Sequence, residues 1–209
     1  MASDGEPPRR GLLVDYGGVL TTNVFASFEA FCRNEGLDPH LVATHFRSNP
    51  EARQLLFDLE VGTLTEEEFE PRFAAVIGVT EPASLIDRLF GGMRTDHAMM
   101  NAVRAAKDAG VRTGLISNSW GKGRYDRSQF PALFDGVVIS GEVGVRKPDP
   151  RIYELGAEAI GLEPAACVFV DDLGANLKPA RELGMATVHH TDAQDTVPQL
   201  ERLLGVRLH

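Results

Sequence analysis

The sequence predicts an α/β protein with a parallel sheet of about five strands and a small helical cap inserted after the first strand. In the second half of the chain, short apolar runs alternate with amphipathic segments, a pattern typical of strands and helices that alternate around a parallel sheet. Between residues 23 and 95 nothing has the pattern of a strand, although an apolar strand comes just before. A helical block in that position indicates an insertion, and we expect it to cover the face that carries the chemistry.

The composition is that of a globular protein and excludes several classes of partner. The 209 residues are 43% hydrophobic and 24% charged, so the chain can bury a core of ordinary size. A net charge of −9 argues against nucleic acid or an anionic membrane as a partner. Cys32 and Cys167 lie in apolar contexts, which predicts buried thiols in a cytoplasmic protein. No run of 18 apolar residues occurs and residues 1–10 lack an apolar region, so we expect no membrane span and no signal peptide.

The cap, residues 23–95, is predicted to contain several amphipathic helices. Asn23 is positioned to cap the first helix and Gly36 to end it. Thr65 and Glu68 have the spacing of a capping box. Pro71 either kinks the helix that follows or marks its true start. Helices are expected over residues 24–35, over 40–59 with a break near Pro50, over 65–77 and over 82–90.

The core is predicted to consist of residues 11–22 and 96–209, after a flexible N-terminal tail of residues 1–10. Gly110, Gly161 and Gly184 are positioned to end three of its helices. Strands are expected over residues 11–16, 111–117, 136–140, 167–170 and 186–189, and helices over 96–109, 149–160, 173–183 and 196–204.

The first strand leads into the stretch VDYGGVL, which places Asp15 before a turn loosened by Gly17 and Gly18. A lone ionised carboxylate among apolar neighbours loses much of its hydration, so we expect a metal or a lysine beside it. The carboxyl ends of parallel strands are also where an open α/β sheet binds its ligands. The alternative on this stretch alone is a hairpin turn in which Asp15 caps a loop.

Three later segments also end in polar residues that do not belong in a core. Ser117 and Asn118 follow the second core strand and can hold phosphoryl oxygens with a hydroxyl and backbone N–H groups. Lys147 lies in a loop stiffened by prolines, and Asp171 and Asp172 follow the fourth strand, where an acid pair suits Mg²⁺. Taken singly, each has a structural alternative: turn residues, a solvated loop lysine, and a helix cap.

In this chain order, Asp, Ser, Lys and Asp-Asp, the four segments resemble the motifs of the haloacid dehalogenase-like hydrolases. Asp15 matches the nucleophile of the first motif, Ser117 the second, Lys147 the third, and Asp172 with Asn176 the fourth. The resemblance covers nearly the whole chain. It is strongest to the branch that holds the N-terminal phosphatase domain of soluble epoxide hydrolase, through the stretches SNSW, VRKPDPRIY and DDLGANLKPARELGM. It implies a Rossmann-like core with a helical cap inserted after the first motif.

The resemblance also implies a magnesium-dependent phosphatase that acts on a small phosphate monoester through an aspartyl phosphate. In the roles that it implies, Asp15 is the nucleophile and Lys147 the catalytic cation, and the phosphoryl oxygens are bound by Ser117, Asn118 and Lys147. Mg²⁺ would be held by Asp15, the Gly17 carbonyl and Asp172. Asp171 and Asn176 would fix the metal waters and Asp172.

Gly17 is the one departure from the family pattern that bears on activity. Family phosphatases usually carry an acid two residues after the nucleophile, which protonates the leaving group and then activates water. Such an acid–base group contributes roughly 10²–10⁴ in rate. Without it, we expect a preference for leaving groups that need little protonation, such as those of aryl or acyl phosphates.

Two other functions are left open by the sequence. Metal-free 2-haloacid dehalogenases of the family also lack the second acid, but they carry a tyrosine there, whereas this chain has Tyr16 one place earlier and keeps the acid pair. The chain could also bind a phosphate ligand without turning it over. We expect His97, His189 and His190 to be surface or capping residues and Trp120 to pack near the cap. The sequence is compatible with a monomer or a homodimer.

Overall fold

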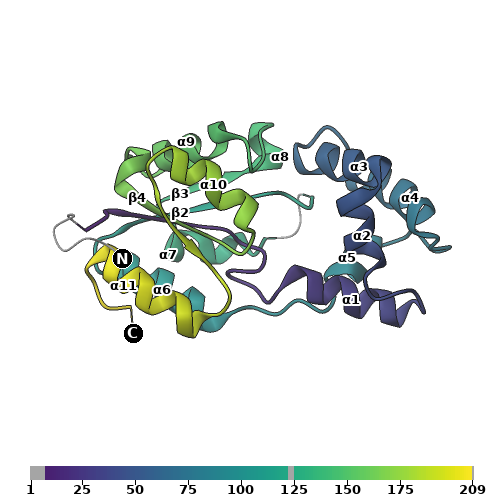
Figure 1. The fold of residues 1–209 in the computed structure, drawn as a ribbon, viewed down its shortest axis with the longest axis horizontal. Coiled ribbons are helices and arrows are strands. Elements are labelled where there is room, and N and C mark those ends of the chain that lie inside the picture. The colour runs from purple at the N-terminus through teal and green to yellow at the C-terminus, as the bar shows by residue number, and fades with distance from the viewer. Residues whose placement is uncertain (1–7, 122–124, 209) are drawn as a thin grey trace.

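The computed structural model describes residues 8–121 and 125–208. Within them, five strands form one parallel sheet in the order β3-β2-β1-β4-β5, and helices cover both of its faces (Figure 1). The predicted α/β class and five-stranded parallel sheet are therefore confirmed. The strands are β1 (Gly11–Val14), β2 (Arg112–Ser117), β3 (Gly136–Ile139), β4 (Cys167–Asp171) and β5 (Ala186–His189).

The core helices divide between the two faces of the sheet. Leu12 and Val14 of β1 point to one face and Leu13 to the other, because side chains alternate along a strand. The first face packs against α6, α7 and α11, and the second against α9 and α10. The helices of the core are α6 (His97–Asp108), α7 (Phe130–Leu133), α8 (Ser140–Val143), α9 (Pro150–Ala159), α10 (Gly174–Glu182) and α11 (Ala193–Leu204), with 3₁₀ turns η1 (Arg127–Gln129) and η2 (Pro164–Ala166).

The segment between β1 and α6 is helical and buries its own apolar cluster, which includes Phe28, Phe69 and Phe73. Figure 1 shows this group of helices as a separate body beside the core. Its helices are α1 (Val24–Asn34), α2 (Leu41–Ser48), α3 (Pro50–Glu60), α4 (Glu66–Ile77) and α5 (Leu85–Phe90). We refer to these five helices and the loops between them as the helical insertion.

Helix ends in the insertion follow the local sequence. The Asn23 side chain accepts a hydrogen bond from the Ala26 N–H at 3.1 Å and caps α1. Thr65 and Glu68 form the predicted capping box. Asn49 caps α3, whose first residue is Pro50, so the expected break between α2 and α3 falls there. Helix α4 begins at Glu66 and runs through Pro71, which therefore does not mark its start.

Two chain segments connect the insertion to the core, and they lie side by side. Thr21 and Thr95 form an antiparallel bridge, and the Thr22 N–H donates to the Arg94 carbonyl at 2.7 Å. Of the expected tail, residues 1–7 lie outside the described residues, and the Arg9 N–H donates to the Leu203 carbonyl at 2.9 Å. Within the described part of the chain, no helix has the length and apolar character needed to cross a bilayer.

Candidate active site

Two acidic residues lie where the central strands β1 and β4 end, at the same edge of the sheet. Val14 of β1 is in register with Val170 of β4, and the Asp15 N–H donates to the Val170 carbonyl at 2.9 Å. Asp15 and Asp171 therefore leave the sheet at the same level, and both are buried. A buried acid pair of this kind requires a cation nearby.

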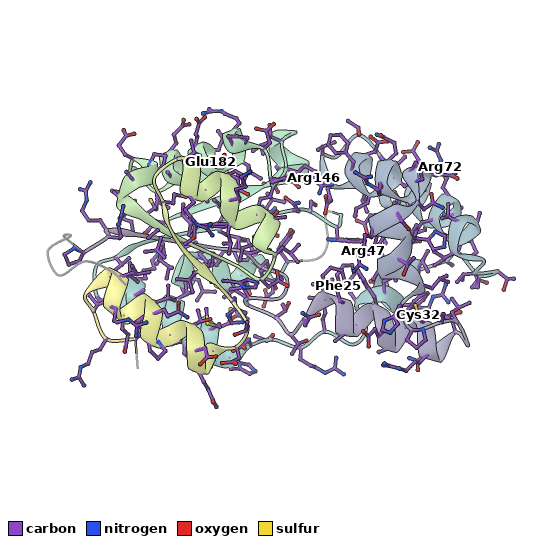
Figure 2. All side chains as sticks on the ribbon, in the orientation of Figure 1. Phe25, Cys32, Arg47, Arg72, Arg146 and Glu182 are labelled. Carbon is purple, nitrogen blue, oxygen red and sulfur yellow. The ribbon has the colours of Figure 1, made fainter. Side chains whose placement is uncertain are left out.

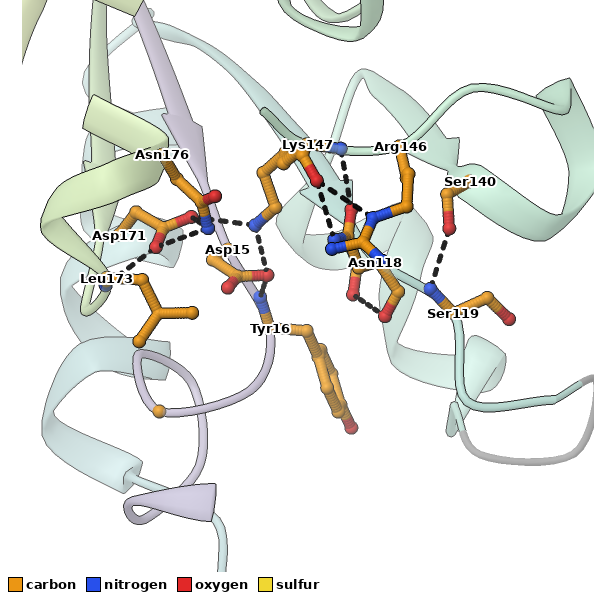
Figure 3. Close-up of polar contacts among 12 residues, drawn as sticks. Asp15, Tyr16, Asn118, Ser119, Ser140, Arg146, Lys147, Asp171, Leu173 and Asn176 are labelled. Atoms are coloured by element: carbon orange, nitrogen blue, oxygen red, sulfur yellow. Dashed lines mark hydrogen bonds and ion pairs between the residues drawn. The ribbon is translucent and has the colours of Figure 1, made fainter. Parts of the chain in front are cut away.

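Lys147 provides a positive charge between these two acids (Figure 3). Its ammonium Nζ lies 2.8 Å from Asp15 Oδ1 and 2.7 Å from Asp171 Oδ2, and the side chain is only 1% exposed. Burial lowers the pKa of the ammonium, but the carboxylates of Asp15 and Asp171 outweigh burial and hold the pKa above its usual range. Lys147 therefore stays charged between the two acids.

Asp171 uses both carboxylate oxygens to hold its neighbours. Oδ1 accepts from the Leu173 N–H at 2.8 Å, and the Asn176 side-chain amide donates to Oδ1 at 3.0 Å and to Oδ2 at 3.1 Å. With Lys147 as a further partner, Asp171 has little capacity left for another ligand. This geometry suits a residue that positions Lys147 and the start of α10.

Asp15, Asp171 and Asp172 offer carboxylate oxygens that all lie within 4.8 Å of one another. The pKa of Asp15 is raised to about 8 and that of Asp172 to about 6, mainly by burial; neighbouring carboxylates act in the same direction and Lys147 opposes them. The single positive charge of Lys147 therefore cannot balance the three carboxylates, and the cluster keeps an excess of negative charge. Among the described residues, the polar contacts of the Asp15 side chain all involve Oδ1, which leaves Oδ2 available. Hard oxygen donors in this arrangement fit Mg²⁺.

The turn after β1 brings its backbone close to Asp172. Gly18 has a φ of +75°, and a Cβ there would lie 2.3 Å from Asp172 Oδ2. Only glycine meets both demands, the left-handed backbone and the close approach. Gly17 has no positive φ, and a Cβ there would meet the Val24 Cγ2 atom at 3.0 Å.

The end of β2 lies next to the loop that carries Lys147. The Asn118 side-chain amide donates to the Lys147 carbonyl at 3.1 Å, and the Lys147 N–H donates to Asn118 Oδ1 at 2.8 Å. Ser117 is buried, and its Oγ lies 2.9 Å from the Tyr125 Oη. Asn118 therefore fixes Lys147 relative to Ser117.

A single cavity of about 530 Å³ brings the sequence-predicted residues together. Most of the predicted site residues line it: Asp15, Gly17, Ser117, Asn118, Lys147, Asp172 and Asn176. Asp171 does not line it and is fully buried. Residues of the helical insertion form the opposite wall. Four segments that are far apart in the sequence thus meet at one opening.

The lining residues that the sequence did not predict include three with polar contacts in the site: Glu60, Tyr125 and Arg146. Glu60 ends α3, and its Oε2 lies 2.5 Å from Arg146 Nη1, while the Arg146 Nε donates to the Lys147 carbonyl at 3.0 Å. Burial raises the pKa of Glu60 to about 7, although Arg146 and Lys147 lower it. A signal was present for Glu60, because it falls on the buried face of α3 with Ala52.

The histidines and Trp120 have structural contacts. His189 is exposed and its Nε2 lies 2.9 Å from the Asp172 carbonyl oxygen, whereas His190 is buried, not at the surface, and its Nδ1 lies 2.9 Å from Thr196 Oγ1. His97 is the exposed first residue of α6. Trp120 belongs to the core segment after β2 and packs on aromatic rings of the insertion, among them Phe90 at 4.9 Å between centroids.

Comparison with known proteins gives consistent results. The chain is 34% identical over 131 residues to bifunctional epoxide hydrolase 2 of Sus scrofa, which covers 59% of this chain but only 24% of that relative's length. It is 29% identical over 151 residues to a sesquiterpene phosphatase of Aspergillus oryzae, covering 70% of this chain and 77% of that one. The solved structure of a HAD-like family hydrolase from Porphyromonas gingivalis superimposes with a TM-score of 0.71 at 25% identity, over 96% of this chain and 100% of that one. The sequence model of the haloacid dehalogenase-like hydrolases matches residues 10–184, and the chain belongs to this family of hydrolases.

Proposed function

We propose that this hydrolase is a magnesium-dependent phosphatase that acts on a small phosphate monoester. The observation that carries the proposal is the single cavity in which a buried Lys147 faces Asp15, with Ser117 and Asp172 on the same walls. An ammonium, a hydroxyl and an acid cluster around one opening suit an incoming phosphoryl group. The phosphatase relative from Aspergillus oryzae supports the same reaction class.

In the proposed first step, a carboxylate oxygen of Asp15 attacks phosphorus. The bond from phosphorus to the leaving oxygen breaks, and an aspartyl phosphate forms. The Lys147 ammonium offsets negative charge on the phosphoryl oxygens, and the Ser117 hydroxyl with the Asn118 backbone N–H binds them. In the second step water attacks phosphorus, the bond to Asp15 breaks, and inorganic phosphate leaves.

Asp15, the Gly17 carbonyl and Asp172 would hold Mg²⁺, with Asp171 and Asn176 behind them. When bound, the cation neutralises charge between the nucleophile and the substrate. We propose that residues 23–95 serve as the cap and that 11–22 with 96–209 form the catalytic core. The cap supplies part of the cavity wall, so it is placed to select the leaving group.

The direct test is release of phosphate from p-nitrophenyl phosphate with Mg²⁺. We expect turnover that EDTA abolishes and that Asp15→Asn removes while the variant remains folded. Phosphate binding without turnover would favour a binding protein. Halide release from a 2-haloacid that survives EDTA would favour the dehalogenase, and either result would overturn the proposal.

A further inference from the structure

The cavity has two chemically distinct ends. The core end carries the charged groups around Asp15 and Lys147. The opposite wall is apolar and largely aromatic, and it is formed by Phe25, Phe28, Phe46, Leu56, Phe90 and Trp120. Two polar residues of the insertion also line the cavity: Asp87, which is exposed to water, and Glu60, which is buried and paired with Arg146. Arg94 and Thr95, which follow α5, line it as well and are exposed.

Trp120 joins the two bodies of the protein through this wall. It belongs to the core segment that begins with Ser117 and Asn118, yet its ring lies 5.6 Å from the Phe28 ring and 5.6 Å from the Phe46 ring, centroid to centroid. Most of these contacts are edge-on or tilted, as aromatic rings prefer. The wall is therefore continuous from the proposed phosphate end into the insertion.

Part of this apolar wall remains accessible. Phe25 is 37% exposed, and Phe46, Phe90 and Trp120 are only partly buried. Figure 2 labels Phe25 on the helical insertion and Arg146 on the core, where the two bodies face one another. Apolar rings that are exposed to solvent beside a polar site are typical of a ligand-binding site, because a bound ligand shields them from water.

We infer that the leaving group of the substrate is an apolar, ring-bearing alcohol, which stacks against this aromatic wall while its phosphate group lies beside Asp15 and Lys147. The inference rests on the proposed phosphatase function. A cavity of about 530 Å³ is in the range that holds a drug-sized molecule. A sugar stacked against the six apolar side chains of this wall would lose water from its hydroxyl groups without gaining hydrogen-bond partners from them.

Gly17 supports the same class of leaving group by a separate argument. A phenol-type oxygen leaves as a stable anion, so it needs little help from an acid at the Gly17 position. The shape and polarity of the wall and the missing acid thus favour the same substrates, the phosphates of aryl alcohols.

Binding of non-hydrolysable phosphonates tests the inference without any turnover. We would measure the Kd of benzylphosphonate and of methylphosphonate by calorimetry in the presence of Mg²⁺. We expect benzylphosphonate to bind at least tenfold more tightly. Trp120 is the only tryptophan in the chain. A shift of the protein fluorescence on addition of benzylphosphonate would therefore show that the benzyl ring binds beside Trp120, at this wall. Equal Kd values for the two phosphonates would overturn the inference.

Two phenylalanines of the insertion give a matched pair of variants. Phe25 is 37% exposed and lines this cavity, whereas Phe57 is 46% exposed and does not line it. We expect Phe25→Ala to reduce the preference for benzylphosphonate at least threefold and Phe57→Ala to leave it unchanged. An equal effect of the two substitutions would contradict an aromatic site at this wall.

Turnover then separates this inference from the proposed function. Phenyl and 2-naphthyl phosphate have leaving groups of similar acidity but different apolar area. We expect kcat/KM to be at least fivefold higher for 2-naphthyl phosphate. If neither is hydrolysed but benzylphosphonate still binds selectively, the proposed function fails and the apolar site stands. If both are hydrolysed equally well, the apolar site fails and the phosphatase stands.

Discussion

Lys147 is the residue whose removal we expect to have the largest effect on both stability and activity. Its ammonium lies within 2.8 Å of a carboxylate oxygen on Asp15 and on Asp171, and all three side chains are buried. Lys147→Met leaves two buried carboxylates without their cation, which costs about 3–5 kcal/mol. We expect this loss in urea unfolding, together with a fall in kcat of roughly 10²–10³.

Lys178 provides the control for this substitution. Its side chain is 77% exposed, and its Nζ lies 3.9 Å from Glu182 on the same helix. Because exposed ion pairs of this kind contribute little, Lys178→Met should change the free energy of unfolding by less than about 1 kcal/mol. A similar loss in both variants would mean that Lys147 does not act through the buried acids.

Gly18 combines a left-handed backbone with close contact to Asp172. In Gly18→Ala the new Cβ would lie 2.3 Å from Asp172 Oδ2, so the carboxylate must move away from the proposed metal site. We expect Mg²⁺ affinity to fall roughly 10–100-fold, measured by calorimetry. Gly78 has the same φ of +75° with nothing near its Cβ, so Gly78→Ala has the same backbone strain but should bind Mg²⁺ normally. Equal Mg²⁺ affinity in the two variants would contradict the proposed role of Asp172.

Gly17 can accept the side chain that family phosphatases carry at this position. Its φ is not positive, and the nearest atom to a Cβ there is Val24 Cγ2 at 3.0 Å, a tight contact that requires Val24 to shift by a few tenths of an ångström. Gly17→Asp should therefore raise kcat for alkyl phosphates roughly 10–100-fold and change aryl phosphates much less, because only the alkyl leaving group needs a proton. A folded variant with no gain on alkyl phosphates would show that the missing acid does not limit the reaction.

At the scale of elements, strand positions were predicted well because each strand is a short apolar run that ends in, or is directly followed by, a polar residue. The predicted strand over 186–189 matches β5, and the others differ at their ends by a residue or two. The short helices α7 and α8 were not predicted, since four residues carry too little periodicity. The position of Asp15, Ser117 and Asp172 at strand ends also predicted that they lie together, because the carboxyl ends of parallel strands meet at one edge of the sheet; all three line one cavity.

Contacts between the insertion and the core could not be predicted in the same way. Glu60 meets Arg146 across the two bodies, so this contact does not follow from local sequence. Within the core, Tyr125 meets Ser117 from a loop, which local sequence does not predict either. A buried acid at the end of an amphipathic helix was the available signal for Glu60, but its partner lies 86 positions further along the chain. Such pairs depend on how the bodies pack, which periodicity does not describe.

Glu60, the last residue of α3, should make the free energy of unfolding depend on pH. The Glu60 carboxyl faces Arg146 and Lys147, and burial raises its pKa from 4.5 to about 7. An acid whose pKa is raised by folding binds more protons in the folded state, so its contribution to stability is lost as pH rises from about 4.5 to about 7. The full loss is on the order of 3 kcal/mol. We expect urea unfolding of the wild type to become easier over this range and Glu60→Gln to show a smaller decrease.

Glu182→Gln is the control for the pH experiment, because the Glu182 side chain is 64% exposed. This substitution should leave the pH dependence of unfolding as it is in the wild type. Asp15 and Asp172 also have raised pKa values and contribute in the same direction, so the informative quantity is the difference between variants. An unchanged slope in Glu60→Gln would mean that Glu60 is ionised throughout.

At the scale of the whole molecule, the insertion and the core each have their own apolar cluster and are joined at few places. The connecting segments pair at Thr21 and Thr95, Trp120 packs into the insertion, and Glu60 contacts Arg146. Separate clusters with a small shared boundary allow relative motion of the two bodies. The aromatic wall lies at this boundary, so a substrate held there would contact both bodies at once.

Mg²⁺ should stabilise the whole fold, because the proposed donors come from different segments that meet only when the core is folded. A ligand that binds only the folded state at 100 times its Kd adds about 2.7 kcal/mol. For a chain of this length that corresponds to roughly 5–10 °C in Tm. We expect this rise in calorimetric melting with Mg²⁺ but not with NaCl of matched ionic strength, and we expect Asp172→Asn to lose most of it. The same rise in Asp172→Asn would place the cation elsewhere, since this substitution removes a carboxylate charge from the acid cluster while keeping its size.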